Sequence, residues 1–115
     1  MEEMPRPNDA LSNFELMVML AVIRLDSNAY GVPIAEEIES HRGKAVSTGS
    51  VYAAMERLEA KGFVNSELGE STAERGGRAK RYFRITSKGL SEVQETRRTL
   101  VELWSRLPRL QGKKA

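Results

Sequence analysis

Short hydroxyl side chains gather in one segment of the chain, and basic side chains gather in another. Ser47, Thr48 and Ser50 stand close together, and Tyr52 follows within one helical turn. Short hydroxyl groups donate hydrogen bonds to phosphate oxygens without clashing with a sugar-phosphate backbone. Residues 75–84 include five basic side chains and no acidic one. These residue types bind nucleic acid, although a helix cap and a solvated loop are alternatives that the sequence leaves open here.

Catalytic and metal-binding chemistry has few candidates. The chain contains no cysteine and one histidine, His41, which excludes disulfides, thiol nucleophiles and zinc sites built from several Cys or His ligands. It contains no P-loop and no G-x-G-x-x-G motif, and Gly76-Gly77 does not follow a strand–helix unit. Glu36 and Glu37 are adjacent on a predicted helix and project to different sides of it. We therefore predict a protein that is not an enzyme and uses no metal or other cofactor.

Composition indicates a single domain with a hydrophobic core. The 115 residues are 40% hydrophobic and 30% charged, which is not typical of a disordered chain. The longest apolar run, residues 16–23, has eight residues, whereas a membrane-spanning helix needs about 20. The first ten residues lack the basic segment and apolar run of a signal peptide. We expect a soluble, cytoplasmic protein with no membrane partner.

The charged residues are unevenly distributed along the chain. Residues 1–60 carry five basic and ten acidic side chains, and residues 61–115 carry thirteen and six. The net charge of +2 therefore hides a basic second half, which contains the segment 75–84. Such a run favours a polyanionic partner or a solvated face.

Two helices are predicted behind a flexible arm at residues 1–10. Ser12 and Glu15 form a capping-box signature, and the apolar pattern behind them continues helically to about residue 25. This helix is apolar on nearly every side, so it needs cover from more than one direction. After a turn at residues 26–31, Pro33 suits the first turn of a second helix that ends at Gly43.

A third helix, a hairpin and a long last helix follow. Residues 47–50 open the third helix, whose buried stripe is Val51, Met55 and Leu58 and whose end is near residue 62. Alternating apolar residues in 80–86, with a Gly-containing loop before them, indicate a β-hairpin whose other strand lies in 63–70. The last helix begins near residue 86 or 87 and runs to Leu107, where Pro108 prevents continuation.

This order of elements is that of a winged helix-turn-helix, mainly α with a small β-hairpin. We predict a flexible N-terminal arm at 1–10, the winged helix-turn-helix at 11–86, a C-terminal dimerisation helix at 87–108 and a disordered tail at 109–115. The amino end of the third helix would enter the DNA major groove, which is about 12 Å wide, while the basic hairpin tip reaches the backbone or minor groove. The predicted DNA contacts are Ser47, Thr48, Ser50, Tyr52, Arg75, Arg78, Lys80 and Arg81.

The last helix predicts a homodimer. Its apolar residues recur at alternating spacings of three and four from Leu90 to Leu107, interrupted by Arg97, as in a coiled-coil seam. Because the seam is short, packing within one chain is the alternative. We expect this helix to pack on the apolar first helix of a second subunit. The predicted dimer contacts are Leu16, Met19, Leu20, Ile23, Leu90, Val93, Arg97, Leu100, Trp104 and Leu107.

Three segments of the chain resemble the PadR-like transcriptional regulators: AYGVPIAEEIES, STGSVYAAMERLEAKGFV and RGGRAKRYFRITSKGL. They carry a Tyr-Gly start of the second helix, a Gly-x-x-Tyr start of the third with an R-L-E-x-K-G exit, and a basic wing before I-T-x-K-G. The resemblance covers about residues 12–107 and implies a dimeric repressor whose last helix supplies the dimer contact. It also implies DNA contacts at a subset of the residues above, namely Ser47, Thr48, Tyr52, Arg78, Lys80 and Arg81.

The chain departs from the family pattern at two places. Many members have Pro after the recognition-helix Tyr, whereas this chain has Ala53, so its third helix is expected to be straighter and its base contacts different. The turn of the wing is also longer than in the tightest hairpins.

Trp104 has two interpretations. Some relatives bind aromatic drugs between their first and last helices, so the resemblance offers Trp104 as a stacking partner for a small aromatic inducer. The alternative is a core anchor, because tryptophan buries a large area wherever it packs. Met17, Met19 and Met55 are likewise interpreted as core residues, and His41 as a surface residue.

The leading prediction is a dimeric, sequence-specific DNA-binding transcriptional regulator, a repressor that binds a palindromic operator through its third helix and wing. Two-fold symmetry would place two recognition helices about 34 Å apart, one turn of DNA. The alternative is a winged-helix module that binds another protein and no DNA, which a weak salt dependence of partner binding would reveal.

Overall fold

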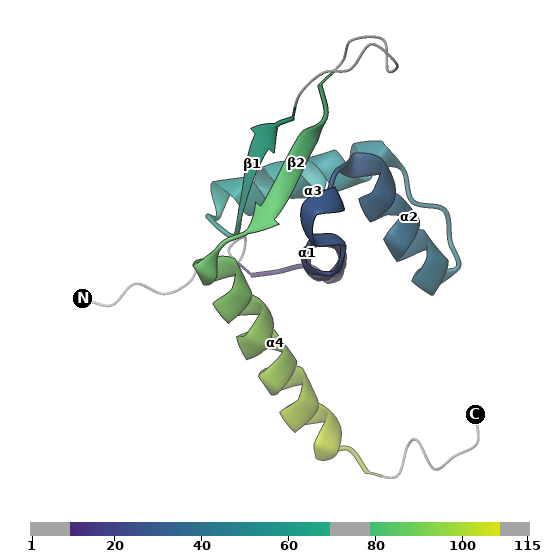
Figure 1. Ribbon diagram of the computed structural model, residues 1–115. Coiled ribbons are helices and arrows are strands. Elements are labelled where there is room, and N and C mark those ends of the chain that lie inside the picture. The colour runs from purple at the N-terminus through teal and green to yellow at the C-terminus, as the bar shows by residue number, and fades with distance from the viewer. Residues whose placement is uncertain (1–9, 70–78, 109–115) are drawn as a thin grey trace.

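The computed structural model describes residues 10–69 and 79–108. Its elements, in chain order, are α1 (Asn13–Leu25), the 3-10 helix η2 (Asp26–Asn28), α2 (Gly31–Arg42), α3 (Thr48–Ala60), β1 (Val64–Leu68), β2 (Arg81–Ile85) and α4 (Ser87–Ser105) (Figure 1). This is the predicted fold class, mainly helical with one small antiparallel hairpin. Most of the predicted arm, the tip of the wing and the tail at 109–115 lie outside the described residues.

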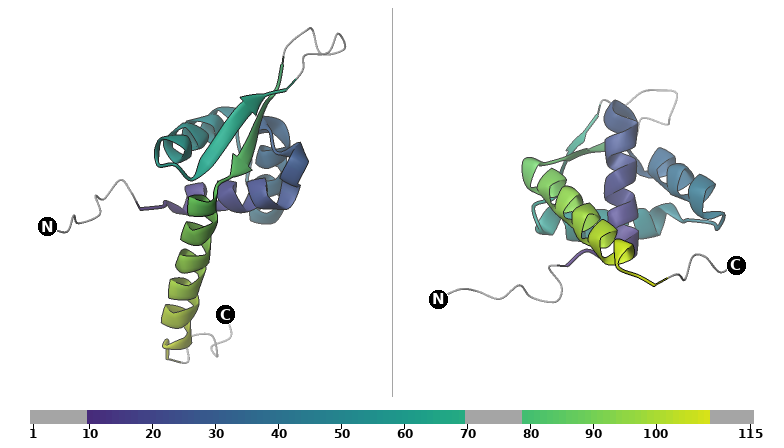
Figure 2. Two further views of the ribbon diagram at one scale, coloured as in Figure 1. Left: turned by 60° about the vertical axis from the view of Figure 1, so that its left-hand side comes forward. Right: turned by 90° about the horizontal axis from the view of Figure 1, so that it is seen from below.

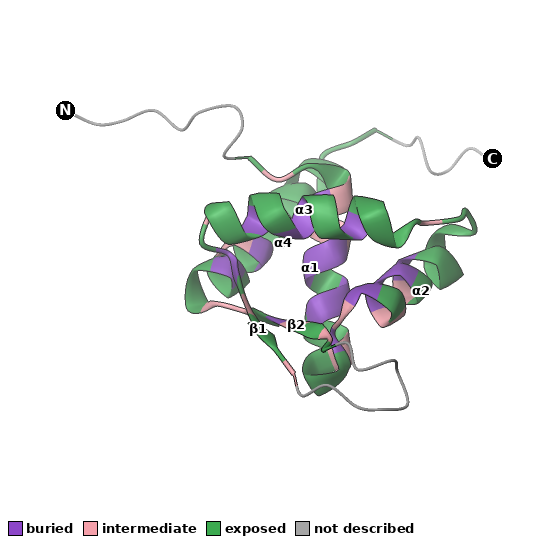
Figure 3. Cartoon of the chain, turned by 90° about the horizontal axis from the view of Figure 1, so that it is seen from above, coloured by how far each residue is buried: buried purple, intermediate pink, exposed green. Residues whose placement is uncertain are grey.

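Helix α1 lies between the other elements and supplies much of the core (Figure 3). The predicted capping box is present: the Glu15 N–H donates to Ser12 Oγ at 3.1 Å, and the Ser12 N–H donates to Glu15 Oε1 at 3.0 Å. One side of α1 is buried through Val18 and Met19, which have no exposed surface. Its other side leaves Leu20 47% exposed. Within one chain, α1 is therefore covered on one side only.

Helices α2 and α3 pack on α1 and on each other, as a helix-turn-helix requires. The apolar residues of α2 are buried at Ile34, Ala35 and Ile38, and the helix ends at Gly43, whose φ of +76° is the left-handed conformation typical of a C-cap. The buried residues of α3 recur at helical spacing and are Val51, Ala54, Met55 and Leu58.

The hairpin is held against the helices by two buried strand residues, Val64 of β1 and Phe83 of β2. Strands β1 and β2 pair antiparallel, with Val64 opposite Ile85 and Ser66 opposite Phe83. The Phe83 side chain is buried, and its backbone N–H donates to the Ala29 carbonyl at 2.9 Å. Because a two-stranded sheet is marginal in water on its own, these contacts with the segment before α2 keep the hairpin in place.

Helix α4 leaves the body of the protein soon after it begins (Figures 1 and 2). Val93, 8% exposed, is the last buried residue of the helix, and every residue of 97–108 is exposed. Nothing within residues 10–69 and 79–108 therefore covers the carboxyl half of α4. No helix within residues 10–69 and 79–108 combines the length and apolarity needed to cross a membrane.

Candidate nucleic-acid interface

The amino end of α3 is exposed and is capped by its own hydroxyl residues. Ser47 is the N-cap, and its Oγ accepts the Ser50 N–H at 3.1 Å. The two serine hydroxyl oxygens are also hydrogen-bonded at 2.7 Å. Thr48 and Gly49 are exposed beside them. The hydroxyls thus act as caps in the free protein, and all of them remain accessible to a partner.

Tyr52 is positioned by its contacts with two other elements, β2 and α2. It is 40% exposed, and its ring packs against Phe83 of β2 with centroids 6.1 Å apart. Its hydroxyl end reaches the first residue of α2, where a Cβ on Gly31 would lie 2.5 Å from Tyr52 Oη and 2.7 Å from the ring. Gly31 is therefore required for Tyr52 to lie across the start of α2.

Replacing Gly31 with alanine is expected to lower the free energy of unfolding by about 1–3 kcal/mol, because the new methyl group displaces the Tyr52 ring from its packing. Urea denaturation measures the change. The matched control is Gly49→Ala, where the nearest heavy atom would be 3.9 Å away and the helix should gain stability. Equal stability of the two variants would contradict the packing argument.

The base of the wing carries two predicted DNA contacts that are engaged within the protein. Arg81 Nη1 donates to Ser66 Oγ at 3.0 Å, and that hydroxyl donates to Glu59 Oε2 of α3 at 2.9 Å. Lys80 Nζ lies 4.1 Å from the centre of the Tyr30 ring, a cation–π distance. Arg75 and Arg78, which the sequence predicts at the tip of the wing, lie outside the described residues.

A groove runs between α3 and the hairpin, beside the exposed amino end of α3. Its volume is about 440 Å³, and its lining residues are Tyr52, Ala53, Met55, Glu56, Glu59, Arg81 and Phe83. Two of the predicted contact residues, Tyr52 and Arg81, thus face one groove although they lie far apart in the sequence. The hydrogen bonds from Arg81 to Ser66 and from Ser66 to Glu59 join its two walls.

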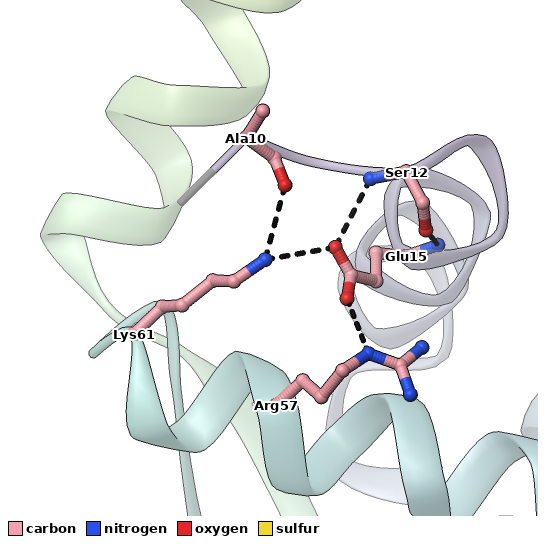
Figure 4. A network of polar contacts seen from close by, with 5 residues as sticks. All are labelled: Ala10, Ser12, Glu15, Arg57 and Lys61. Carbon is pink, nitrogen blue, oxygen red and sulfur yellow. Dashed lines mark hydrogen bonds and ion pairs between the residues drawn. The ribbon is translucent and has the colours of Figure 1, made fainter. Parts of the chain in front are cut away.

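A buried carboxylate ties α1 to α3, and the sequence did not predict it. Glu15 is 3% exposed, and its carboxylate accepts from Arg57 Nε at 2.6 Å and from Lys61 Nζ at 3.0 Å (Figure 4). Lys61 Nζ also donates to the Ala10 carbonyl at 3.1 Å. The capping box pointed to Glu15, but nothing in the sequence connects it with residues on another helix.

The Glu15 carboxyl has a lowered pKa. Burial by itself raises the pKa of a carboxyl group, but hydrogen bonds from Arg57, from the Ser12 backbone and from Lys61, together with the charge of Lys61, more than offset this and bring the pKa below its ordinary value of 4.5. Glu15 is therefore ionised at neutral pH and holds the amino end of α1 against the carboxyl end of α3.

The residues predicted at a dimer surface differ in their exposure. Met19 is completely buried in the core and Val93 nearly so, which corrects the assignment of Met19: it has no surface to offer a second chain. Leu16 is half-buried and Arg97 is exposed. The exposed apolar members are Leu20, Ile23, Leu90, Leu100, Trp104 and Leu107. Trp104 is 69% exposed, so it is no core anchor of a single chain.

Comparisons with known proteins place the chain in a family. The model of the transcriptional regulator PadR-like family matches residues 19–95. The chain belongs to this family. It is 37% identical over 78 residues to transcriptional regulator Rv3488 of Mycobacterium tuberculosis, a match that covers 68% of each protein.

Two solved structures show the same fold. A PadR-like transcription factor from Bacteroides fragilis aligns with a TM-score of 0.69 and 27% identity, covering 80% of this chain and 84% of that one. A PadR family regulator from Eggerthella lenta aligns with a TM-score of 0.65 and 24% identity, covering 85% and 83%. The PadR-like fold, a winged helix-turn-helix, positions the interface described above, and PadR-like regulators bind DNA.

Hydrogen bonds and ion pairs in the structure give a role to the charged and glycine residues of the PadR-like segments. In R-L-E-x-K-G, Arg57 and Lys61 form ion pairs with Glu15, and Glu59 accepts a hydrogen bond from Ser66. Gly62 adopts a φ of +81°. These contacts connect α3 with α1 on one side and with the wing on the other.

The I-T-x-K-G segment joins the start of α4 to the end of α3. Thr86 Oγ1 accepts the Gly89 N–H at 2.9 Å and donates to the Gly62 carbonyl at 2.8 Å, while Lys88 Nζ donates to the Lys61 carbonyl at 2.9 Å. A Cβ on Gly89 would lie 2.1 Å from the Phe63 carbonyl oxygen, so only glycine fits there. The first turn of α4 is thereby attached directly to the α3–β1 connection.

Proposed function

We propose that this PadR-like regulator is a homodimeric repressor that binds a palindromic operator in double-stranded DNA through α3 and the wing. The observation that carries the proposal is the groove between α3 and β2, which Tyr52 and Arg81 share beside an exposed, hydroxyl-rich helix end. A duplex placed against α3 and the wing would meet the Tyr52 hydroxyl and the Arg81 guanidinium as donors and the carboxylates of Glu56 and Glu59 as acceptors, all from this one groove.

Each predicted contact has a role in this proposal. The free N–H groups and positive dipole end of α3 attract phosphate, and the lack of a side chain at Gly49 lets the backbone approach closely. Ser47, Ser50 and Tyr52 donate to phosphate oxygens, while exposed Thr48 is aimed at base edges. Lys80 and Arg81, with Arg75 and Arg78 farther along the wing, bind the backbone or the minor groove beside the recognition helix.

Dimerisation rests on the apolar surface that one chain leaves uncovered. Leu100 is 46% and Trp104 69% exposed along one seam of α4, Leu107 just beyond the end of α4 is 43% exposed, and Leu20 of α1 is 47% exposed. A monomer rarely leaves such an apolar surface in water. Pairing α4 with α1 of a second chain covers both surfaces in a two-fold dimer, which then presents two α3 helices to two half-sites about 34 Å apart.

The salt dependence of binding tests the proposal. We expect the logarithm of the association constant for a duplex carrying the operator to fall linearly with the logarithm of salt concentration, with a slope of about −0.9 per phosphate contact. A footprint on DNA upstream of the protein's own gene is the place to find that operator. Absence of binding to any duplex at low salt, with a protein partner retained at high salt, would instead favour a protein-binding module.

Replacing Lys80 with alanine is expected to weaken binding to all duplexes by a similar factor and to reduce the salt slope by about one unit, because the substitution removes one phosphate contact. Fluorescence anisotropy at several salt concentrations measures both quantities. Arg98→Ala, on the exposed side of α4 far from the wing, is the matched control and should leave the slope unchanged. A slope that is the same for wild type and Lys80→Ala would remove Lys80 from the interface.

A small aromatic inducer is a further part of the proposal, and the exposure of Trp104 favours it. The indole is 69% exposed in one chain, and in the proposed dimer it would lie between α4 and α1 of the second chain, where an aromatic molecule inserted at this seam can stack on it. Quenching of the fluorescence of Trp104, the chain's only tryptophan, on titration with flat aromatic compounds tests this.

A further inference from the structure

The outward side of α3 carries one long side chain among small ones. Gly49, Ala53, Glu56 and Ala60 are spaced at four, three and four residues, which places them on one line of the helix. This line is opposite the buried stripe, and all four residues are exposed. Because the other three residues on this line are glycine and alanine, Glu56 has the longest side chain of the four.

Glu56 differs from the other charged residues of α3 in its surroundings. Arg57 is paired with Glu15, and Glu59 accepts from Ser66. Among residues 10–69 and 79–108, no hydrogen bond or ion pair is formed by the Glu56 carboxylate, which lines the groove between α3 and β2. Within the described residues, the Glu56 carboxylate therefore makes no polar contact that stabilises the fold.

A carboxylate on the side of α3 that faces DNA is unfavourable for general binding. It repels phosphates and accepts hydrogen bonds without donating any. In the major groove its partner is an amino group, and the pairing of a carboxylate with the N4 amino group of cytosine is the one its acceptor chemistry favours. The methyl group of Ala53, one turn earlier, suits contact with a thymine methyl.

We propose that Glu56 is a specificity-determining residue that accepts a hydrogen bond from the N4 amino group of a cytosine in each half-site, with Ala53 against a thymine methyl at the adjacent base pair. The two residues are about 4.5 Å apart along the helix axis, close to the base-pair rise of about 3.4 Å. This assignment rests on the proposed DNA-binding function and names the bases that α3 reads. Guanine and thymine offer the carboxylate no donor in the major groove, and adenine offers its N6 amino group only beside the N7 acceptor, which repels a carboxylate.

Selection from a pool of random duplexes tests the assignment, with the full chain and its Glu56→Gln variant compared at one salt concentration. We expect the wild type to select cytosine at one position of each half-site. Glutamine pairs with adenine through its amide, so the variant should select adenine there and lose preference for cytosine by about tenfold or more. Glu36→Gln, at an exposed carboxylate of α2 that does not line the groove, is the matched control and should retain cytosine.

The outcomes separate this inference from the function on which it rests. Identical base preferences for wild type and Glu56→Gln, with clear selection by both, would overturn the role of Glu56 and leave the DNA-binding function in place. A wild-type chain that enriches no duplex would overturn both. Because Glu56 is exposed, its variant should unfold at the wild-type urea concentration, which establishes that any change of preference does not arise from misfolding.

Discussion

Replacing Trp104 with alanine is expected to raise the dissociation constant of the homodimer at least a hundredfold, about 3 kcal/mol. The indole is 69% exposed in one chain and lies on the apolar seam of α4, so its burial would come from a second chain. In a two-fold interface the substitution removes the side chain twice. Sedimentation equilibrium at several protein concentrations measures the change directly.

Because Trp104 is exposed in one chain, the Trp104→Ala variant can lose dimerisation without losing its fold. Because the side chain contributes little to the core of one protomer, Trp104→Ala should keep its far-ultraviolet circular dichroism. Val32→Ala, at a 49% exposed apolar residue on α2, is the matched control and should remain dimeric. A Trp104→Ala protein with wild-type association and wild-type stability would place the dimer contact elsewhere. Weaker DNA binding should accompany dissociation, because one half-site replaces two.

Replacing Glu15 with glutamine is expected to lower the free energy of unfolding by about 2 kcal/mol at neutral pH. The amide keeps the shape of the side chain but lacks the charge that pairs with Arg57 and Lys61. It also places a donor next to two donors in a site that is 3% exposed. Urea denaturation measures the loss, with Glu36→Gln on the exposed side of α2 as the control.

The effect of Glu15 should depend on pH with a definite sign. Its pKa in the folded protein lies below its ordinary value of 4.5, so the unfolded chain binds the proton more readily. The stabilisation is therefore complete above the unfolded pKa and is lost as pH falls through the lower folded pKa. The difference between wild type and Glu15→Gln should shrink progressively below about pH 4.5. A difference that stays constant down to strongly acid pH would show that the ion pairs are not its source.

Local patterns in the sequence predicted the elements of this protein well, because each depends on residues near in the chain. The capping box at Ser12, the left-handed Gly43 and the buried stripe of α3 are set by spacing and by backbone conformation alone. The order of the elements was then enough to predict the fold class. The choice of Ser47 as the N-cap of α3 follows from the same local chemistry.

Only the tertiary structure decided which residues meet across the fold. Glu15 and Arg57 are 42 positions apart, and Arg81 and Ser66 are 15 apart, so no local pattern joins them. Burial was also decided there: the apolar pattern of α1 does not distinguish Met19, which is buried, from Leu20, which is exposed. The physical reason is that an apolar helix can be rotated about its axis without loss of local stability. The packing of the neighbouring elements then determines which of its sides is buried. The sequence by itself determined the elements and their order, and the packing determined the α3–hairpin groove and the surface left uncovered for a second chain.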